Sequence, residues 1–238
     1  MIGCRCPVCT SLDYRDKRLR TSIHVEIDGQ SIVVDTGPDF RQQMLRENIS
    51  RLDAVIFTHA HRDHTAGLDD VRAYNFMQQM DMPVYGTRPT LDQLGVEYAY
   101  AFHPKAYPGL PRITLTEINE NPFAVNGTTI LPLPVMHLKL PVFGFRFQDF
   151  SYITDANHIP QDTIDRLKGT DVLVLNALQR ESHVSHFNLD EALKMIKIIH
   201  PRKTYLTHIS HRLGVHGVVD RELPANVSLA FDGLQLQF

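Results

Sequence analysis

Long apolar runs are absent from this sequence. No segment approaches the ~18 continuous apolar residues of a membrane span, and residues 1–20 lack the apolar stretch of a signal peptide. We therefore predict a cytoplasmic protein without a membrane partner. Linkers are also absent, since no Pro-, Gly- or Ser-rich tract and no charge block divides the 238 residues. A chain of this length can form one α/β domain, and we predict a single domain over residues 1–238.

A charge excess of either sign is lacking as well. The formal net charge of −3 gives no global electrostatic reason to expect a large nucleic acid or an anionic membrane as the main partner. The hydrophobic share of 43% and the charged share of 21% are ordinary for a globular protein with a sizeable core, and they argue against disorder. We expect any electrostatic steering to be local.

Short strands and helices alternate along the predicted chain. The hydrophobic periodicity favours helices at residues 39–48, 65–79, 90–102, 160–168 and 188–199. Strands are predicted at 21–36 (a hairpin turning at Asp28-Gly29), 52–57, 82–87, within 112–136, at 143–155 (a hairpin turning at Gln148-Asp149), 171–178 and 203–210, with a last pair around Asp232-Gly233. Strand-rich blocks with interspersed helices predict an α/β sandwich, with binding residues just beyond strand ends.

The segment THAHRDHTAG follows one of these strands and holds three imidazoles and a carboxylate within six residues. In an extended stretch, His59 and His61 project to the same side and can bind one metal ion. Asp63 and His64, where the backbone turns toward a helix, can face a second ion. The alternative is a polar loop with surface histidines, but a cluster of this density favours a metal site.

This HxHxDH run after an apolar strand resembles the signature of the metallo-β-lactamase superfamily. The resemblance implies an αββα four-layer sandwich with two divalent metal ions at one edge of the two sheets. It also implies three downstream ligands, which match His137 after ILPLPVM, Asp155 at the end of YITD and His208 in YLTHIS. By the same resemblance, one ion is bound by His59, His61 and His137, the other by Asp63, His64 and His208, and Asp155 bridges them.

Asp35, in VVDTGPDF, matches the strand-end aspartate that supports the metal site in this superfamily. An aspartate before Thr-Gly can also be a simple turn former, so both interpretations stay open.

All three cysteines, Cys4, Cys6 and Cys9, lie in the segment GCRCPVCTS. An odd number at these spacings suits a metal better than a disulfide framework, although a redox pair with a spare thiol is the alternative. Three thiolates need one more ligand for a closed tetrahedral zinc site, and His211 stands three residues after His208. We predict a structural zinc site built by residues 1–11 and His211.

The cysteine cluster together with HxHxDH resembles the PhnP-like phosphodiesterases, in which the same cysteines and a late histidine hold a structural zinc. Relatives carry a Gly-rich first strand before the equivalent of IGCRCP, whereas Met1 directly precedes Ile2 here. We therefore expect a less stable sheet edge. This branch implies a small phosphodiester substrate, such as a cyclic ribose phosphate or a nucleotide-like diester, and a homodimer.

The charge of the implied centre suits such a substrate. Two divalent ions, two aspartates and a bridging hydroxide leave a net charge of about +1, which fits a phosphodiester monoanion attacked by that hydroxide. Ligands of only His and Asp suit Mn, Zn or Fe. His186 matches the general-acid histidine of family phosphodiesterases, and we predict a catalytic role for it beside Asp63 and Asp155. His183 is its rival, and both can instead be loop or helix-capping residues.

Several rival functions are disfavoured by single features. A common β-lactamase would use a cysteine at the second metal, a flavodiiron-like oxidoreductase would have Glu in place of His61, and a transfer-RNA-processing nuclease would carry a long Gly/Pro-rich arm. A non-hydrolytic relative similar to pyrroloquinoline-quinone biosynthesis protein B, a metal-binding protein without turnover, and a hydrolase of another ester stay open. The basic run at residues 15–20 is interpreted as a solvated face. The other histidines are interpreted as structural or exposed: His24, His103, His158, His200 and His216.

Overall fold

The computed structural model describes residues 1–103 and 109–238. The chain forms two compact units, one made of Arg20–Thr129 and the other of Met1–Leu19 with Ile130–Phe238. The prediction of one domain stays a prediction. Within the described residues, every helix is too short or too polar to span a lipid bilayer.

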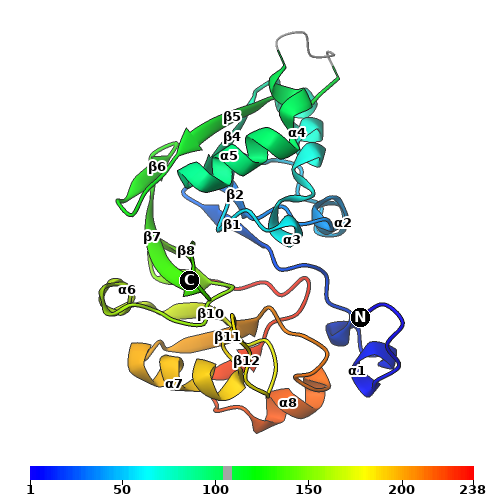
Figure 1. Ribbon diagram of the computed structural model, residues 1–238, viewed down its shortest axis with the longest axis vertical. Coiled ribbons are helices and arrows are strands. Elements are labelled where there is room, and N and C mark those ends of the chain that lie inside the picture. Colours follow the sequence, from blue (N-terminus) through cyan, green and yellow to red (C-terminus); the bar gives the residue numbers. More distant parts are fainter. Residues whose placement is uncertain (104–108) are drawn as a thin grey trace. The chain divides into compact units, whose positions relative to one another are not determined.

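The unit Arg20–Thr129 is built on a five-stranded sheet in the order β1-β2-β3-β4-β5 (Figure 1). Its strands are β1 (Ile23–Ile27), β2 (Gln30–Val34), β3 (Ala54–Ile56), β4 (Met82–Gly86) and β5 (Ile113–Glu117). The predicted hairpin is confirmed, because β1 pairs antiparallel with β2 across a two-residue turn. Asp28 and Gly29 adopt φ of 50° and 74° there, the left-handed values that such turns require. The remaining pairs are parallel.

The helical segments of this unit are α2 (Phe40–Arg46), α3 (Arg62–Thr65), η2 (Leu68–Val71), α4 (Arg72–Gln78), α5 (Arg88–Glu97) and η3 (Ala99–Phe102), and the short strand β6 (Phe123–Val125) follows β5. The helix predicted at 65–79 is therefore divided into a 3-10 turn and α4. Phe40, Leu68, Tyr74 and Leu94 are buried in one apolar cluster with the sheet residue Val84. This cluster fixes α2, η2, α4 and α5 on the sheet.

Two glycines let the loop after β2 pack against the segment that contains α3. A Cβ atom on Gly67 would lie 2.2 Å from the Gly37 carbonyl oxygen, and one on Gly37 would lie 2.4 Å from the Asp63 carbonyl oxygen. The Gly67 amide also donates to the Thr36 carbonyl at 2.8 Å. The backbone that holds Asp35 is thereby pressed against the backbone that holds Asp63 and its neighbours.

The other unit contains a sheet with strands in the order β12-β11-β10-β9-β8-β7. They are β7 (Thr128–His137), β8 (Leu140–Phe147), β9 (Phe150–Ile153), β10 (Val172–Asn176), β11 (Lys203–Thr207) and β12 (Val227–Leu229). β7, β8 and β9 are antiparallel, and β9 to β12 are parallel. The predicted hairpin at Gln148-Asp149 is confirmed, with a Gln148 φ of 50°.

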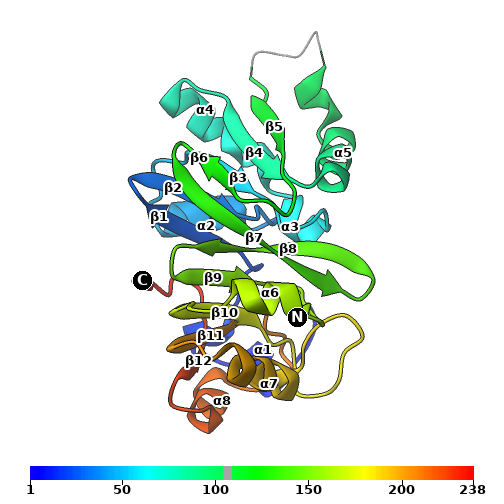
Figure 2. The same cartoon turned by 90° about the vertical axis from the view of Figure 1, so that its left-hand side faces the viewer.

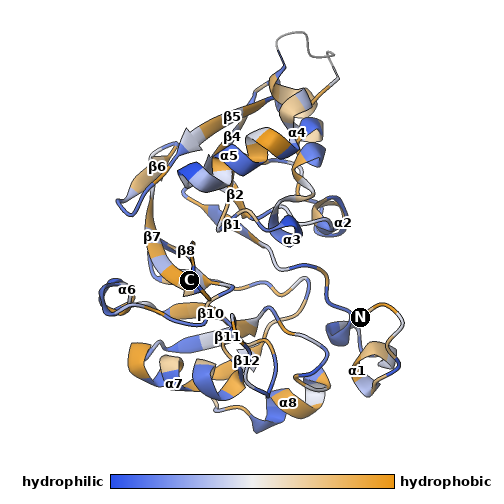
Figure 3. Cartoon of the chain, viewed as in Figure 1, coloured by the Kyte–Doolittle hydropathy of each residue, from blue (hydrophilic) through white to orange (hydrophobic). Residues whose placement is uncertain are grey.

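The helical segments of this second unit are α1 (Pro7–Thr10), η1 (Tyr14–Asp16), α6 (Gln161–Arg166), α7 (Leu189–Ile199) and α8 (His216–Glu222). Figures 1 and 2 show α7 beside the parallel strands. Asn188 caps α7, since its side chain accepts from the Glu191 amide while the Glu191 carboxylate accepts from the Asn188 amide. The helix alternates hydrophobic and hydrophilic residues (Figure 3) and buries Ala192 and Ile196.

One prediction about this unit was wrong, and another holds only in part. Only β12 lies near the chain's end, and Asp232-Gly233 forms a turn after it rather than joining two strands, with a Gly233 φ of 85°. The basic run at 15–20 is not a solvated face throughout: the Arg18 side chain is 14% exposed and lies 3.5 Å from the buried Asp16 carboxylate. Arg18 also donates to Nδ1 of His216 at 3.0 Å, so this part of the run has a structural role.

Candidate metal centres

The HxHxDH residues follow β3 directly, in a loop that ends in α3. His59 and His64 are buried, whereas His61 is exposed. Nε2 of His59 lies 3.0 Å from Nδ1 of His61, and the centres of the two rings are 4.5 Å apart. This separation is that of a hydrogen bond between the two rings, and it is close to the roughly 3.3 Å between two nitrogens that bind one tetrahedral ion.

Asp35 orients the histidines of this loop through hydrogen bonds. Its fully buried carboxylate accepts from Nδ1 of His64 at 2.8 Å, from the Thr58 amide at 2.9 Å and from the Thr58 hydroxyl at 2.8 Å. Because the Thr58 hydroxyl gives its proton to Asp35, it accepts from Nδ1 of His59 at 2.9 Å. Both imidazoles are thus protonated on Nδ1 and carry their lone pair on Nε2, the atom that a metal would bind.

The same burial affects the charge of Asp35. Burial raises the pKa of this carboxyl group, and the charge of His64 together with the hydrogen bonds from His64 and Thr58 opposes the increase. Of the two interpretations of Asp35, the hydrogen bonds favour a residue that supports the candidate metal ligands over a simple turn former.

Asp63 lies at the more open side of this loop. Its carboxylate is 4.0 Å from Nε2 of His64, and its side chain is 35% exposed. Arg20 approaches it to 3.7 Å. Nε2 of His64 and the carboxylate oxygen of Asp63 face each other. They are the nitrogen and oxygen ligands predicted for the second ion.

The second unit brings His137, Asp155, His186 and His208 together at the ends of β7, β9 and β11 and in the loop before α7. Oδ1 of Asp155 lies 3.3 Å from Nε2 of His208 and 3.8 Å from Nδ1 of His186. Candidate ligand atoms of His137, Asp155 and His186 all lie within 4.8 Å of one another. His137 faces the carbonyl of Ser185 at 2.8 Å through Nδ1, which must donate, so Nε2 is left for a metal.

His186 is buried among these groups. Its ring lies 4.6 Å from that of His137 and 4.7 Å from that of His208. Burial, followed by repulsion from His208, lowers the pKa of His186 to about 3, although the Asp155 carboxylate opposes this shift. The rival His183 is exposed, with its ring 5.1 Å from that of His186.

Three strand-end residues of the predicted set share an unusual backbone conformation. Asp35, Asp155 and His208 have φ of 65°, 55° and 52°, the left-handed region that favours glycine. An L-residue there costs about 1–2 kcal/mol, and such conformations cluster at functional sites. The hydrophobic pattern gave no sign of this feature.

Sequence reasoning also missed the residues that hold the ligands in place. Thr58 links Asp35 to His59, and the Thr154 hydroxyl donates to Oδ2 of Asp155 at 2.7 Å. Each threonine directly precedes a predicted ligand, which is the only sequence signal for this role.

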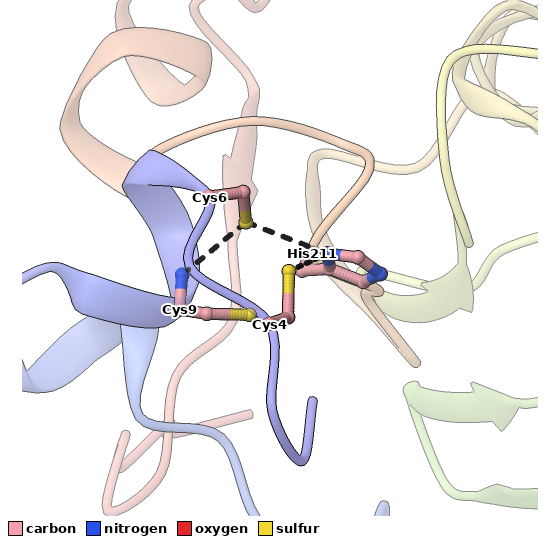
Figure 4. Close-up of side chains that lie close together, drawn as sticks. All are labelled: Cys4, Cys6, Cys9 and His211. Atoms are coloured by element: carbon pink, nitrogen blue, oxygen red, sulfur yellow. Dashed lines mark hydrogen bonds between the residues drawn. The ribbon is translucent and has the colours of Figure 1, made fainter.

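The three cysteines and His211 converge in the second unit (Figure 4). Nδ1 of His211 lies 3.5 Å from Sγ of Cys4 and 3.4 Å from Sγ of Cys6. Sulfur and nitrogen ligands of a tetrahedral zinc are separated by roughly 3.5 Å, so these distances fit a shared ion. All three cysteines are free thiols. The Cys9 amide and then His211 lower the pKa of Cys6 to about 6, which favours the thiolate that a metal binds.

The remaining histidines include two with structural contacts, as predicted. His24 bonds to the Ser31 hydroxyl at 2.8 Å, and the buried His216 accepts from Arg18. His200 ends α7 in a left-handed conformation, while His103 and His158 are exposed.

The chain matches a known protein family and is similar to a solved structure. Residues 30–209 match the family described as "Beta-lactamase superfamily domain". A crystal structure of a diphosphatase from the PhnP family has a TM-score of 0.93 and 38% sequence identity, and the match covers 100% of this chain and 91% of that one. With its two sheets and helices, the structure confirms the predicted metallo-β-lactamase fold.

Two curated relatives carry other names. An octanoyltransferase of Porphyromonas gingivalis is 37% identical over 237 residues, which is 98% of this chain and 48% of that protein. A ribonuclease Z of a Mycobacterium species is 26% identical over 185 residues, which is 69% of this chain and 65% of that protein. The chain therefore spans about half the length of the first relative and just under two thirds of the second.

Proposed function

Because the chain belongs to the metallo-β-lactamase superfamily, in its PhnP-like branch, we propose that it is a metal-dependent phosphodiesterase acting on small phosphodiesters. Relatives named diphosphatase and ribonuclease Z support a metal-dependent hydrolase. The observation that carries the proposal is the protonation pattern of the histidines: Nδ1 of His59, His64 and His137 each donates a hydrogen bond to the protein, which places the lone pair of each ring on Nε2, the atom that a metal would bind.

The proposed assignment of ligands follows the family resemblance. His59, His61 and His137 would hold one divalent ion, Asp63, His64 and His208 would hold the other, and Asp155 would be a ligand shared by both. When bound, such ions lower the pKa of a coordinated water from ~15.7 toward ~7 and neutralise phosphoryl oxygens.

The chain's own side chains fix the charge of the site. Asp63 and Asp155 bring two negative charges, and the imidazoles are neutral when they act as ligands. With two divalent ions and one coordinated hydroxide, the net charge of the site would be about +1, which suits a monoanionic phosphodiester better than a phosphomonoester dianion. Mn, Zn and Fe all suit these donors.

His186 is proposed as the general acid for the leaving alkoxide. Its Nδ1 is buried without a hydrogen-bond partner among the described residues, 3.8 Å from the Asp155 carboxylate. The pKa of about 3 already includes the effect of that carboxylate, so a bound anionic substrate must raise the pKa of His186 before the ring can donate a proton near neutral pH. His186→Ala should therefore lose roughly 10²- to 10⁴-fold with an alkyl leaving group and much less with p-nitrophenolate. His183→Ala is the matched control, and equal losses on both substrates would exclude the acid role of His186.

The direct test is hydrolysis of bis(p-nitrophenyl) phosphate by the protein loaded with Mn²⁺ or Zn²⁺. We expect turnover that disappears in His208→Ala and in Asp155→Asn. Absence of turnover by fully metallated protein would refute the phosphodiesterase and favour a non-hydrolytic relative.

Hydrolysis of a diphosphate linkage is the second candidate, favoured by the name of the 38% identical PhnP-family relative. A panel of substituted diphosphates and phosphodiesters at equal concentration separates the two activities, because the leaving group is a phosphate in one case and an alcohol in the other. The octanoyltransferase relative is about twice as long as the part aligned here, so its named activity is not assigned to this chain.

A further inference from the structure

We propose that Leu138 and Val184 form an apolar face that binds the aromatic or apolar substituent of the substrate, and that Asn157 positions them. This inference rests on the proposed function and adds the chemical class of the group attached to the phosphorus. All three residues belong to the second unit and flank the ligand histidines in its chain.

Leu138 occupies a turn position that an ordinary leucine would avoid. His137 pairs with Leu140 in the β7–β8 hairpin, so Leu138 is the first residue of a two-residue turn. Its φ is 58°, in the left-handed region that favours glycine or asparagine. Burial of the side chain does not offset this strain, since Leu138 is 54% exposed. An exposed leucine held in a strained turn beside a ligand suggests a contact with something outside the chain.

Asn157 ties this turn to the loop before α7. Its Oδ1 accepts from the Leu138 amide at 2.9 Å, and its Nδ2 donates to the Val184 carbonyl at 3.1 Å. One carboxamide therefore holds both backbones. The Asn157 amide also donates to the Met136 carbonyl at 2.9 Å, which fixes Asn157 itself against the end of β7.

A second tie runs beside the first. The hydrogen bond between His137 and the Ser185 carbonyl joins the residues next to Leu138 and Val184. The two loops are thus held side by side at consecutive positions, with the ligand His137 and the proposed acid His186 on the same segments. Val184 is 72% exposed, so both apolar side chains of the pair are open to a ligand.

The chemistry of this pair selects the substituent. Neither side chain can hydrogen-bond, and neither is charged. The pair therefore favours an aryl or other large apolar group over a small methyl group or a solvated sugar hydroxyl. An apolar contact of this size typically changes binding by about 10-fold.

The test compares methyl phenylphosphonate with methyl methylphosphonate as ligands of the Mn²⁺-loaded protein, by calorimetry. Both esters are monoanions with the same metal-binding group, and they differ in the apolar substituent on phosphorus. We expect the wild-type protein to bind the phenylphosphonate ester about 10-fold more tightly, and Leu138→Gly to reduce this preference to less than about 3-fold. Leu138→Gly also relieves the left-handed strain, so a lost preference cannot be attributed to unfolding if its melting temperature is unchanged or higher.

Asn157→Ala should reduce the same preference although Leu138 and Val184 are both still present. This result would distinguish the positioning role of Asn157 from the direct contact made by the two apolar side chains. Ile198→Ala is the control, because Ile198 is an apolar residue of α7 that is 59% exposed and far along the chain from the hairpin. Equal binding of the two phosphonates by the wild type, or an unchanged preference in Leu138→Gly, would overturn the proposal. A preference without any diester hydrolysis would instead overturn the proposed function and leave the apolar face established.

Discussion

Replacing Asp35 by asparagine should weaken metal binding and also lower the stability of the fold. In the native site, Oδ2 of Asp35 accepts from both the Thr58 hydroxyl and Nδ1 of His64, and Oδ1 accepts from the Thr58 amide. An asparagine that keeps its oxygen toward the Thr58 amide presents an NH₂ group to the other two donors. The hydroxyl can rotate to accept, but His64 must move its proton from Nδ1 to Nε2.

That change of tautomer removes the lone pair that we assign to the metal. Losing such a supporting hydrogen bond typically weakens metal binding by roughly 10- to 100-fold. The altered buried hydrogen bonds should also lower the free energy of unfolding by about 1–3 kcal/mol. Affinity is measured by competition with a fluorescent chelator, and stability by urea denaturation of the metal-free protein.

Asp53→Asn is the matched control in the same unit. Asp53 is also buried and accepts from the Ser31 amide at 2.8 Å and from Arg51 at 3.0 Å. It should lose stability but keep its affinity for metal. If Asp35→Asn binds metal within about twofold of the wild type, the proposed orientation of His64 is wrong.

Three further changes test other parts of the structure. Cys6→Ser should reduce bound zinc by one ion per chain and lower the melting temperature, as measured by elemental analysis and calorimetry; unchanged zinc content would exclude the predicted structural site. Asn188→Ala should destabilise by about 1 kcal/mol in urea denaturation through loss of the α7 cap, and an unchanged midpoint would show that the cap is dispensable. Gly67→Ala should destabilise by about 1–3 kcal/mol, because its Cβ would lie 2.2 Å from a carbonyl oxygen. Gly95→Ala, in α5 with nothing within 4 Å, should instead stabilise by about 0.5–1 kcal/mol, and a similar effect of both alanines would contradict the packing described.

The candidate ligands could be selected from the sequence because they are dense or follow clear strands. His59, His61 and His64 lie within six residues, and His137 and His208 each follow an apolar strand. Resemblance to a known family added the order in which the downstream ligands occur. The hydrogen bonds made by Nδ1 of His59, His64 and His137 then indicate that the lone pair of each of these three rings is on Nε2.

Features that depend on distant partners could not be predicted. Arg18 lies in a basic run that resembles a solvated face, but its partner His216 is 198 residues away. The left-handed conformation of Asp155 depends on how β9 ends, which a pattern of apolar residues does not encode. The missed helix α8 has seven residues, too few for a clear hydrophobic period, and the turn at Asp232-Gly233 lacked a second strand to join.

The cysteine cluster has a consequence for the topology of the chain. Cys4 and His211 are 207 residues apart, so a zinc ion bound by them would close nearly the whole polypeptide into a ring. In the chain-entropy description used for disulfides, a loop of this length removes enough freedom from the unfolded chain to contribute roughly 5 kcal/mol. The cross-link would be reversible without any redox chemistry, since acid or a chelator would open it. Such a protein would depend on metal supply for its resistance to unfolding, much as a secreted protein depends on an oxidising compartment.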